Sequence, residues 1–261
     1  DDLVGEAEPE APLADPQPGT LLGTADGRTW LAQLRPGATP YPGEHRVRGL
    51  EVVPVSVMMH TLLTAATGDD TSTALRDIRF EYPIIVDQPR VIKVEIDGDR
   101  VVVSSSRASD SPRRWVRHAT ATIGTAPETT EPAPGQSYTA PDLGDAGWDG
   151  AAIEDFQRAM GIEGQPFPWS VRGCAPPPSG LRADIDLPDI ADAALIDAAT
   201  HLARLAARSN TRLMLPAAAD GVRVAERITA GPASLDVTYR ALGDDELVVD
   251  ITVTDAEGAV L

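Results

Sequence analysis

The sequence predicts an α+β fold in which two helices are each followed by groups of antiparallel strands. Apolar residues recur at helical spacing in two segments, 55–66 and 189–208. Short runs of alternating residues surround these segments, and turn signals such as Asp26-Gly27 and Asp97-Gly98-Asp99 separate them. Groups of strands interrupted by single helices are typical of α+β domains.

In the first half, Asp26-Gly27 is a hairpin signal that leads into a strand at 30–34. A loop follows over 36–49. Pro54 then opens the first helix and Gly68 lies just past its end, as helix boundaries favour. Further strands are predicted at 75–86, 90–96, 100–106 and 115–123.

The second half is predicted to repeat this order of elements. An irregular, proline-rich stretch runs to Pro188, and the helix at 189–208 follows. Strands are expected near 212–215, 223–228, 234–242 and 246–254. No sequence repeat accompanies the repeated order. A helix wrapped by a bent antiparallel sheet, present twice, is the hotdog arrangement.

Composition divides the 261 residues into two units and two linkers. Residues 1–18 are acidic and proline-rich, unlike a signal peptide, and are predicted to form an interdomain linker. Residues 126–150 are rich in Pro, Thr, Gly and Asp and are predicted to form a connecting linker. The two units are therefore expected at 19–125 and 151–261.

Composition also narrows the class of function. The formal net charge of −18 disfavours nucleic acid and acidic membrane surfaces as partners. No apolar run approaches the roughly 18 residues that a membrane helix needs. Cys174 is the single cysteine, which indicates a cytoplasmic protein without internal disulfides. The four histidines lack metal-ligand spacing, so no metal site is expected.

A histidine lies just before the first helix, in the stretch GEHRVRGLEVVP at 43–54, which contains the pattern H-x-x-x-G-x-x-x-x-P. On a loop, His45 can face a cleft, and its ordinary pKa of roughly 6.5 suits a general base. Gly49 would let the backbone pass close to a ligand. Pro54 would fix the helix start and aim its free N–H groups and positive dipole end at the same site. The alternative is a loop histidine without catalytic function.

A carboxylate and a second histidine share one face of the second helix. Asp197 and His201 are four residues apart, and Arg204 and Arg208 continue the same polar stripe. The spacing alone favours a solvated face with ion pairs. A pair of functional groups facing a cleft is the alternative.

These motifs resemble those of polyketide and fatty acid synthase dehydratase domains. The stretch from His45 to Pro54 resembles their histidine motif, and Asp197 to His201 resembles their D-x-x-x-Q/H aspartate motif. The stretches FEYPIIVDQPRVIKV, GQPFPWSVRG and LIDAATHL look like those of 6-methylsalicylic acid synthase-type iterative synthases. The resemblance spans about residues 19–261.

The resemblance implies a double hotdog, a pseudodimer in which His45 and Asp197 meet across the cleft between the halves. His201 would orient Asp197, and desolvation would raise the pKa of Asp197 so that it acts as a general acid. Phe167 stands where modular dehydratases carry a tyrosine, which removes a hydroxyl from the site. Trp169 is a candidate lining residue.

The implied reaction is loss of water from a β-hydroxyacyl chain during aromatic polyketide assembly. The chain would be carried on the phosphopantetheine of an acyl carrier protein, and the domain itself would need no cofactor. Neighbouring synthase domains are further expected partners, and the intact synthase would be a homodimer. Two alternatives remain. One is a thioester hydrolase that releases the aromatic acid, without a G-x-S-x-G serine. The other is a non-catalytic scaffold.

Overall fold

The fold is described from a computed structural model that covers residues 13–68, 73–125, 150–175, 180–205, 212–224, 228–242 and 246–261. Residues 1–12 and 126–149, which make up most of the two predicted linkers 1–18 and 126–150, lie outside the described residues. The predicted division of the chain into two units at these linkers therefore stays a prediction.

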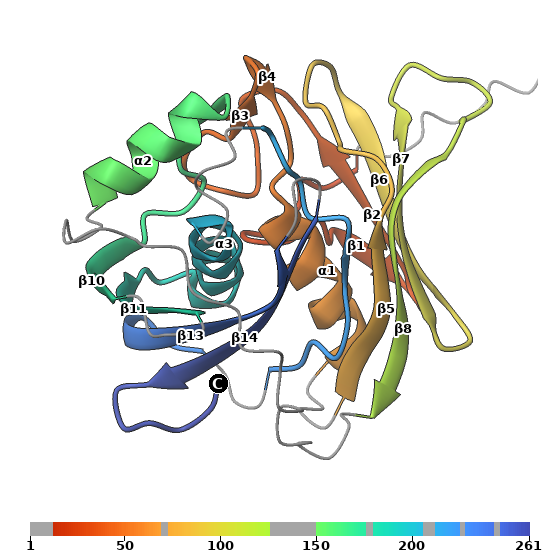
Figure 1. The fold of residues 1–261 in the computed structure, drawn as a ribbon. Helices are drawn as coiled ribbons and strands as arrows, with labels where there is room; N and C mark the ends of the chain where they lie inside the picture. Colours follow the sequence, from red (N-terminus) through yellow and green to blue (C-terminus); the bar gives the residue numbers. More distant parts are fainter. Residues whose placement is uncertain are drawn as a thin grey trace, which may run out of the picture.

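A seven-stranded antiparallel sheet forms most of the first half, with strand order β1-β2-β6-β7-β8-β5-β12. The helix α1, Val55–Thr67, packs across one face of this sheet and contacts β5 to β8 (Figure 1). The strands are β1 Thr24–Asp26, β2 Thr29–Leu34, β5 Thr73–Phe80, β6 Arg90–Asp97, β7 Arg100–Arg107, β8 Val116–Thr125 and β12 Ala218–Ala219.

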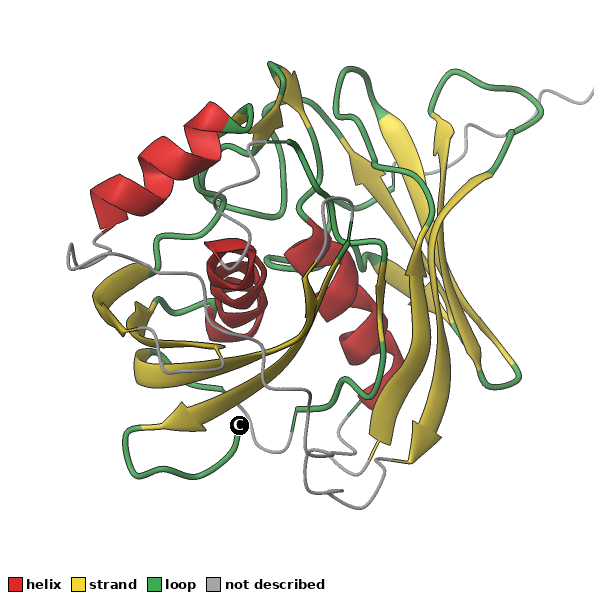
Figure 2. Cartoon of the chain, in the orientation of Figure 1, coloured by secondary structure: helices red, strands yellow, loops and turns green. Residues whose placement is uncertain are grey.

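A four-stranded sheet, β10-β11-β13-β14, forms the second half and packs against the helix α3, Ala191–Arg204. The two central helices lie between the two sheets in Figure 2. The strands are β10 Ser170–Ala175, β11 Gly180–Leu187, β13 Gly231–Leu242 and β14 Leu247–Asp255. This arrangement of sheets and helices confirms the predicted α+β double hotdog.

A small third sheet joins the two halves close to the first helix. Its order is β4-β3-β9, with β3 Arg46–Val47, β4 Leu50–Glu51 and β9 Ile162–Glu163. The helix α2, Gly150–Ala159, precedes β9 and contacts it. Because β3 pairs with β9, the loop that carries His45 is tied to a segment more than a hundred residues later.

The core forms around the two central helices, which pack against each other. The apolar residues of each helix are spaced so that they lie on one face. Leu62 of α1 and Leu202 of α3 are fully buried, and both belong to one core cluster that includes residues of both sheets. Contact between two such helices removes their apolar stripes from water and sets their relative position. No helix among the described residues has the length and apolar character needed to cross a membrane.

The prediction of an irregular stretch up to Pro188 is wrong. The helix α2 and the strands β9, β10 and β11 lie there. The signal was present in β11, where Leu181, Ala183 and Ile185 alternate inward at the period of a strand. The prolines at 176–178, just before this strand, favoured the prediction of irregular structure. Two strands of the second sheet thus precede the second helix.

Two other predicted strands differ from the structure, and a third cannot be compared in full. The first strand after α1 ends at Phe80 rather than at 86. No strand occupies 212–215, and β12 pairs instead with β5 of the first sheet. The strand predicted at 223–228 lies partly outside the described residues.

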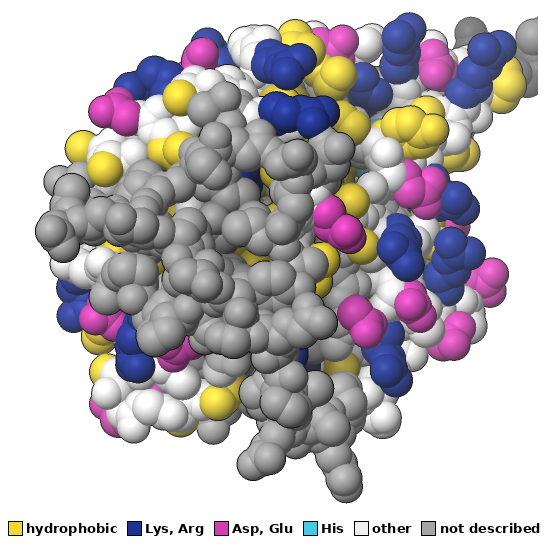
Figure 3. Space-filling view, viewed as in Figure 1, with side chains coloured by type: hydrophobic (Ala, Val, Ile, Leu, Met, Phe, Trp, Pro, Cys, Tyr) yellow, Lys and Arg dark blue, Asp and Glu magenta, His cyan; other side chains and the backbone are white. Residues whose placement is uncertain are grey.

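The charge is distributed rather than gathered into one patch on the face seen in Figure 3. There, Lys and Arg side chains alternate with Asp and Glu over the sheet of the first half. A mixed surface limits repulsion between the excess carboxylates of a chain whose formal net charge is −18.

The loop before His45 gives the first testable prediction, because Gly43 has no room for a side chain. Its N–H donates to the carbonyl of Pro166, and an added Cβ would lie 2.0 Å from the carbonyl oxygen of Gln165. Gly43→Ala is expected to cost about 2–3 kcal/mol in the free energy of unfolding. Urea unfolding measures this loss.

Gly150→Ala is the matched control, because nothing lies within 4 Å of a Cβ added at the start of α2. It is expected to leave the unfolding midpoint unchanged or raised. Equal unfolding midpoints for the two variants would contradict the tight contact at Gly43.

Candidate active site

His45 lies on the loop just before β3, with 9% of its surface exposed. Its Nδ1 is 2.8 Å from the carbonyl oxygen of Val52. A carbonyl only accepts, so Nδ1 carries the proton and Nε2 keeps its lone pair. Glu51 holds the same loop, since its Oε1 accepts from the backbone N–H of His45 and from the hydroxyl of Tyr41.

Several influences act on the pKa of His45, and together they lower it from its ordinary value. Burial lowers the pKa most, and the charge on His201 acts in the same direction. The hydrogen bond to Val52 and the carboxylate of Asp197 oppose this effect. The imidazole is therefore neutral at neutral pH, the form in which it can accept a proton.

Asp197 projects from the middle of α3 and is 2% exposed. The hydroxyl of Ser56 donates to its Oδ1 over 3.0 Å. The indole Nε1–H of Trp169 donates to Oδ2 over 2.8 Å. Two elements far apart in the sequence thus hold one buried carboxylate, which is costly to bury without such partners.

The expectation that desolvation would raise the pKa of Asp197 is wrong. Burial does raise it, but the charge on His201 and the hydrogen bond from Trp169 outweigh burial and lower the pKa. Burial lowers the pKa of His201, and the charge of Asp197 outweighs that effect and raises it. Each group therefore favours the charged form of the other, the carboxylate of Asp197 and the imidazolium of His201.

His201 connects the two halves of the site. Its Nδ1 is 3.3 Å from Oδ2 of Asp197, one helical turn away. Its ring centroid lies 6.4 Å from that of His45 and 5.9 Å from that of Trp169. The structure thus brings His45, Asp197, His201 and Trp169 together, although 152 residues separate the first pair.

The polar stripe on α3 is not a solvated face, so that interpretation is wrong. Asp197 and Arg204 are buried, and His201 is largely enclosed. The guanidinium of Arg204 lies over the ring of Phe156 and donates to the carbonyl of Arg212. Arg208 lies outside the described residues.

The other three predicted site residues are Pro54, Gly49 and Phe167, and each has a structural role of its own. Pro54 precedes α1 with φ −58°, and its carbonyl accepts from the N–H of Val57. Gly49 has φ +79° at the exposed turn between β3 and β4, so its conformation explains the glycine better than a close approach to a ligand. Phe167 is fully buried in the core.

Ser56 is the residue that sequence reasoning missed. A serine at the second position of a helix after proline gives no signal of a partner 141 residues away. The two remaining histidines have hydrogen-bond partners outside the site. His118 contacts the Ser105 hydroxyl and the Tyr82 carbonyl, and His60 contacts the Gly19 carbonyl.

The comparisons with known proteins decide the family. A family model described as "Polyketide synthase dehydratase domain" matches residues 19–108. The chain is 35% identical, over 94% of its length, to a phenolphthiocerol/phthiocerol polyketide synthase of Mycobacterium tuberculosis. The solved dehydratase domain of the polyketide synthase PpsC from the same organism is 26% identical, covers 95% of each chain and has a TM-score of 0.68.

The chain belongs to the polyketide synthase dehydratase family. This dehydratase domain is also 28% identical to the 6-methylsalicylic acid synthase of Aspergillus terreus over 95% of its length. It is 32% identical to the 5-methyl-1-naphthoate synthase of Streptomyces sahachiroi over 60% of its length. The chain spans 10–15% of the length of these curated relatives.

The buried hydroxyl of Ser56 gives the second testable prediction. Ser56→Ala removes a donor from an ionised carboxylate that water does not reach, so the variant is expected to lose about 1.5–3 kcal/mol of unfolding free energy at pH 7. Denaturant unfolding measures this loss.

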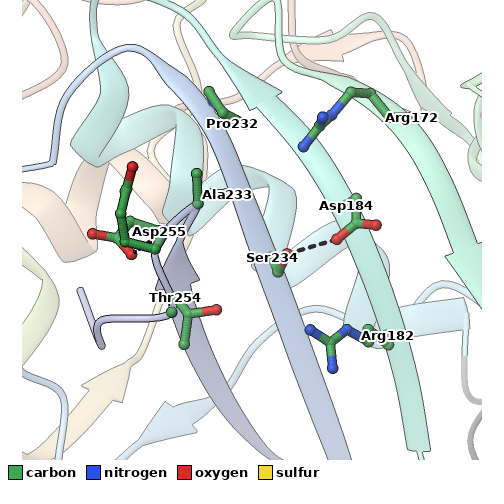
Figure 4. A pocket seen from close by; sticks show the side chains of 11 residues that line it. Arg172, Arg182, Asp184, Pro232, Ala233, Ser234, Thr254 and Asp255 are labelled. Atoms are coloured by element: carbon green, nitrogen blue, oxygen red, sulfur yellow. Dashed lines mark hydrogen bonds between the residues drawn. The ribbon is translucent and has the colours of Figure 1, made fainter.

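The matched control is Ser234→Ala, on the outer face of the second sheet. The Ser234 hydroxyl donates to Asp184 over 2.6 Å in an exposed hollow whose lining residues are separate from the site (Figure 4). This exposed contact is expected to contribute less than about 1 kcal/mol. Equal losses of unfolding free energy in Ser56→Ala and Ser234→Ala would contradict the expectation that burial strengthens the contact between Ser56 and Asp197.

Proposed function

We propose that this dehydratase domain removes water from a β-hydroxyacyl thioester, with His45 as the base and Asp197 as the acid. One observation carries the proposal. An imidazole with an open Nε2 and a buried carboxyl group lie in one cluster at the junction of α1 and α3. Elimination requires a base for the α-hydrogen and a proton donor for the leaving hydroxyl.

In the proposed reaction, Nε2 of His45 takes a proton from the α-carbon, and the electrons of that bond form the double bond to the β-carbon. The bond between the β-carbon and its hydroxyl breaks as the carboxyl of Asp197 delivers a proton, and water leaves. The first N–H groups of α1, which Pro54 precedes, are suited to stabilise enolate charge at the thioester oxygen.

The proposed substrate is carried on the phosphopantetheine of an acyl carrier protein within a larger, dimeric, cytoplasmic synthase. Support comes from relatives that are multidomain synthases many times longer than this chain. Synthases named for 6-methylsalicylic acid and 5-methyl-1-naphthoate are among them, which favours an aromatic product. The proposed chemistry is acid–base chemistry that side chains supply.

The third testable prediction concerns the two proposed reacting groups. His45→Ala and Asp197→Asn are each expected to lower the dehydration rate by about 10²–10⁴-fold, the usual contribution of a positioned acid or base. The substrate is a synthetic 3-hydroxyacyl pantetheine thioester, and mass spectrometry follows loss of water. His60→Gln, a histidine of α1 outside the cluster, is expected to keep the unmodified rate.

An aryl pantetheine thioester in parallel reactions tests the hydrolase alternative. Dehydration of the first substrate without hydrolysis of the second supports the proposal. Hydrolysis of the aryl thioester with no loss of water from the 3-hydroxyacyl thioester would overturn it. Dehydration that survives His45→Ala would remove the assigned base.

A further inference from the structure

The hydrogen bonds at Asp197 create a chemical difficulty for a general acid. Both of its oxygens already accept from donors, Oδ1 from Ser56 and Oδ2 from Trp169. A carboxyl group surrounded by donors is stabilised in its ionised form and has no proton to give. The proton that leaves with the hydroxyl must therefore be stored on another group.

His201 is the titratable group best placed to store it. Its side chain is 11% exposed, and its Nδ1 lies 3.3 Å from Oδ2 of Asp197. This contact is ionic rather than a well-aligned hydrogen bond. The ring of Trp169 lies 5.9 Å away and tilted, within the range in which an aromatic ring attracts a cation. A carboxylate and an aromatic ring thus both favour the protonated imidazole.

The other charged groups around this pair are few among the described residues. His45 faces it from the loop before β3, and Glu51 lies behind His45. His45 is neutral because burial lowers its pKa, while the pKa of His201 is raised by Asp197 despite burial. Of the two imidazoles, His201 is the one whose surroundings favour the protonated form.

We propose that His201 stores the acid proton of the reaction and passes it to the substrate through Asp197. The proton moves from Nδ1 of His201 to the carboxylate, and the neutral carboxyl gives it to the departing hydroxyl. His45 has meanwhile taken the α-proton. Substrate loses one water, His201 ends neutral and His45 ends protonated, so protons balance.

The resting state returns when the proton on His45 goes back to His201. The two ring centroids are 6.4 Å apart, too far for direct transfer and close enough for a bridging water after the product leaves. The water that the substrate loses is formed between His45 and His201, where it can supply this bridge. The same arrangement accounts for hydration in the reverse direction, since each proton retraces its path.

This inference rests on the proposed dehydration, and it differs from a role in which His201 only orients Asp197. A glutamine can orient a carboxylate by donating a hydrogen bond, but it holds no titratable proton. His201→Gln therefore separates the two roles. Under the proposal, His201→Gln has an acid proton only at pH values low enough to protonate the carboxyl group of Asp197.

The fourth testable prediction is a change in the pH profile of kcat with the 3-hydroxyacyl thioester. In the unmodified domain the high-pH limb reflects loss of the proton from His201 above pH 6.5, since its pKa is raised. In His201→Gln this limb is expected to move down by at least about 2 pH units, toward the range of a carboxyl group. His60→Gln is the matched control and is expected to leave the profile in place.

Two outcomes decide the inference. A shifted limb supports it. A rate in His201→Gln that is lower by the same factor at every pH, with an unmoved limb, would overturn it and leave an orienting role. If the unmodified domain removes no water, the proposed function fails, and the next measurement still tests the proton store.

That measurement uses the unmodified domain with ¹⁵N-labelled histidine. The His201 imidazole is identified through its contact with the Trp169 ring and titrated by NMR from pH 5 to pH 9. A protonated imidazole that persists above about pH 6.5, the ordinary value for histidine, supports the inference. A neutral His201 at pH 6.5 would contradict it, whether or not the variant folds.

Discussion

The burial of one carboxylate, Asp197, is the constraint on which the rest of the site depends. A charge removed from water costs several kcal/mol unless donors and an opposite charge replace the solvent. Ser56 from α1, Trp169 from the segment before β10, and His201 from α3 supply those partners. Because Ser56 and Trp169 come from segments other than α3, the carboxylate holds together parts of the fold that the chain separates.

The two sheets provide the frame for this arrangement. Each sheet packs on one central helix, and the two helices pack on each other, which sets the first turn of α1 against the middle of α3. The third sheet then ties the loop of His45 to β9, a few residues before Trp169. The apolar contacts place the helices, and the polar contacts determine which atoms face the substrate.

The two imidazoles differ in protonation although they lie in one cluster. His45 donates from Nδ1 to a neutral backbone carbonyl, so burial dominates and lowers its pKa. His201 faces an ionised carboxylate, so the opposite charge dominates and raises its pKa. A neutral base and a protonated store can therefore exist side by side at one pH, which an elimination reaction requires.

The sequence by itself determined the class of fold, the two central helices, and the two motifs that contain His45 and Asp197. It did so because apolar spacing and the order of Pro and Gly are local properties, readable within a dozen residues. Strands β10 and β11 were missed among prolines, although β11 has the alternation of a buried strand. Tertiary structure alone decided that the polar stripe of α3 is buried, that Ser56 and Trp169 hold Asp197, and that the carboxyl pKa is lowered rather than raised. These properties depend on contacts between residues 28 and 141 positions apart, and the packing of two helices, not local spacing, creates such contacts.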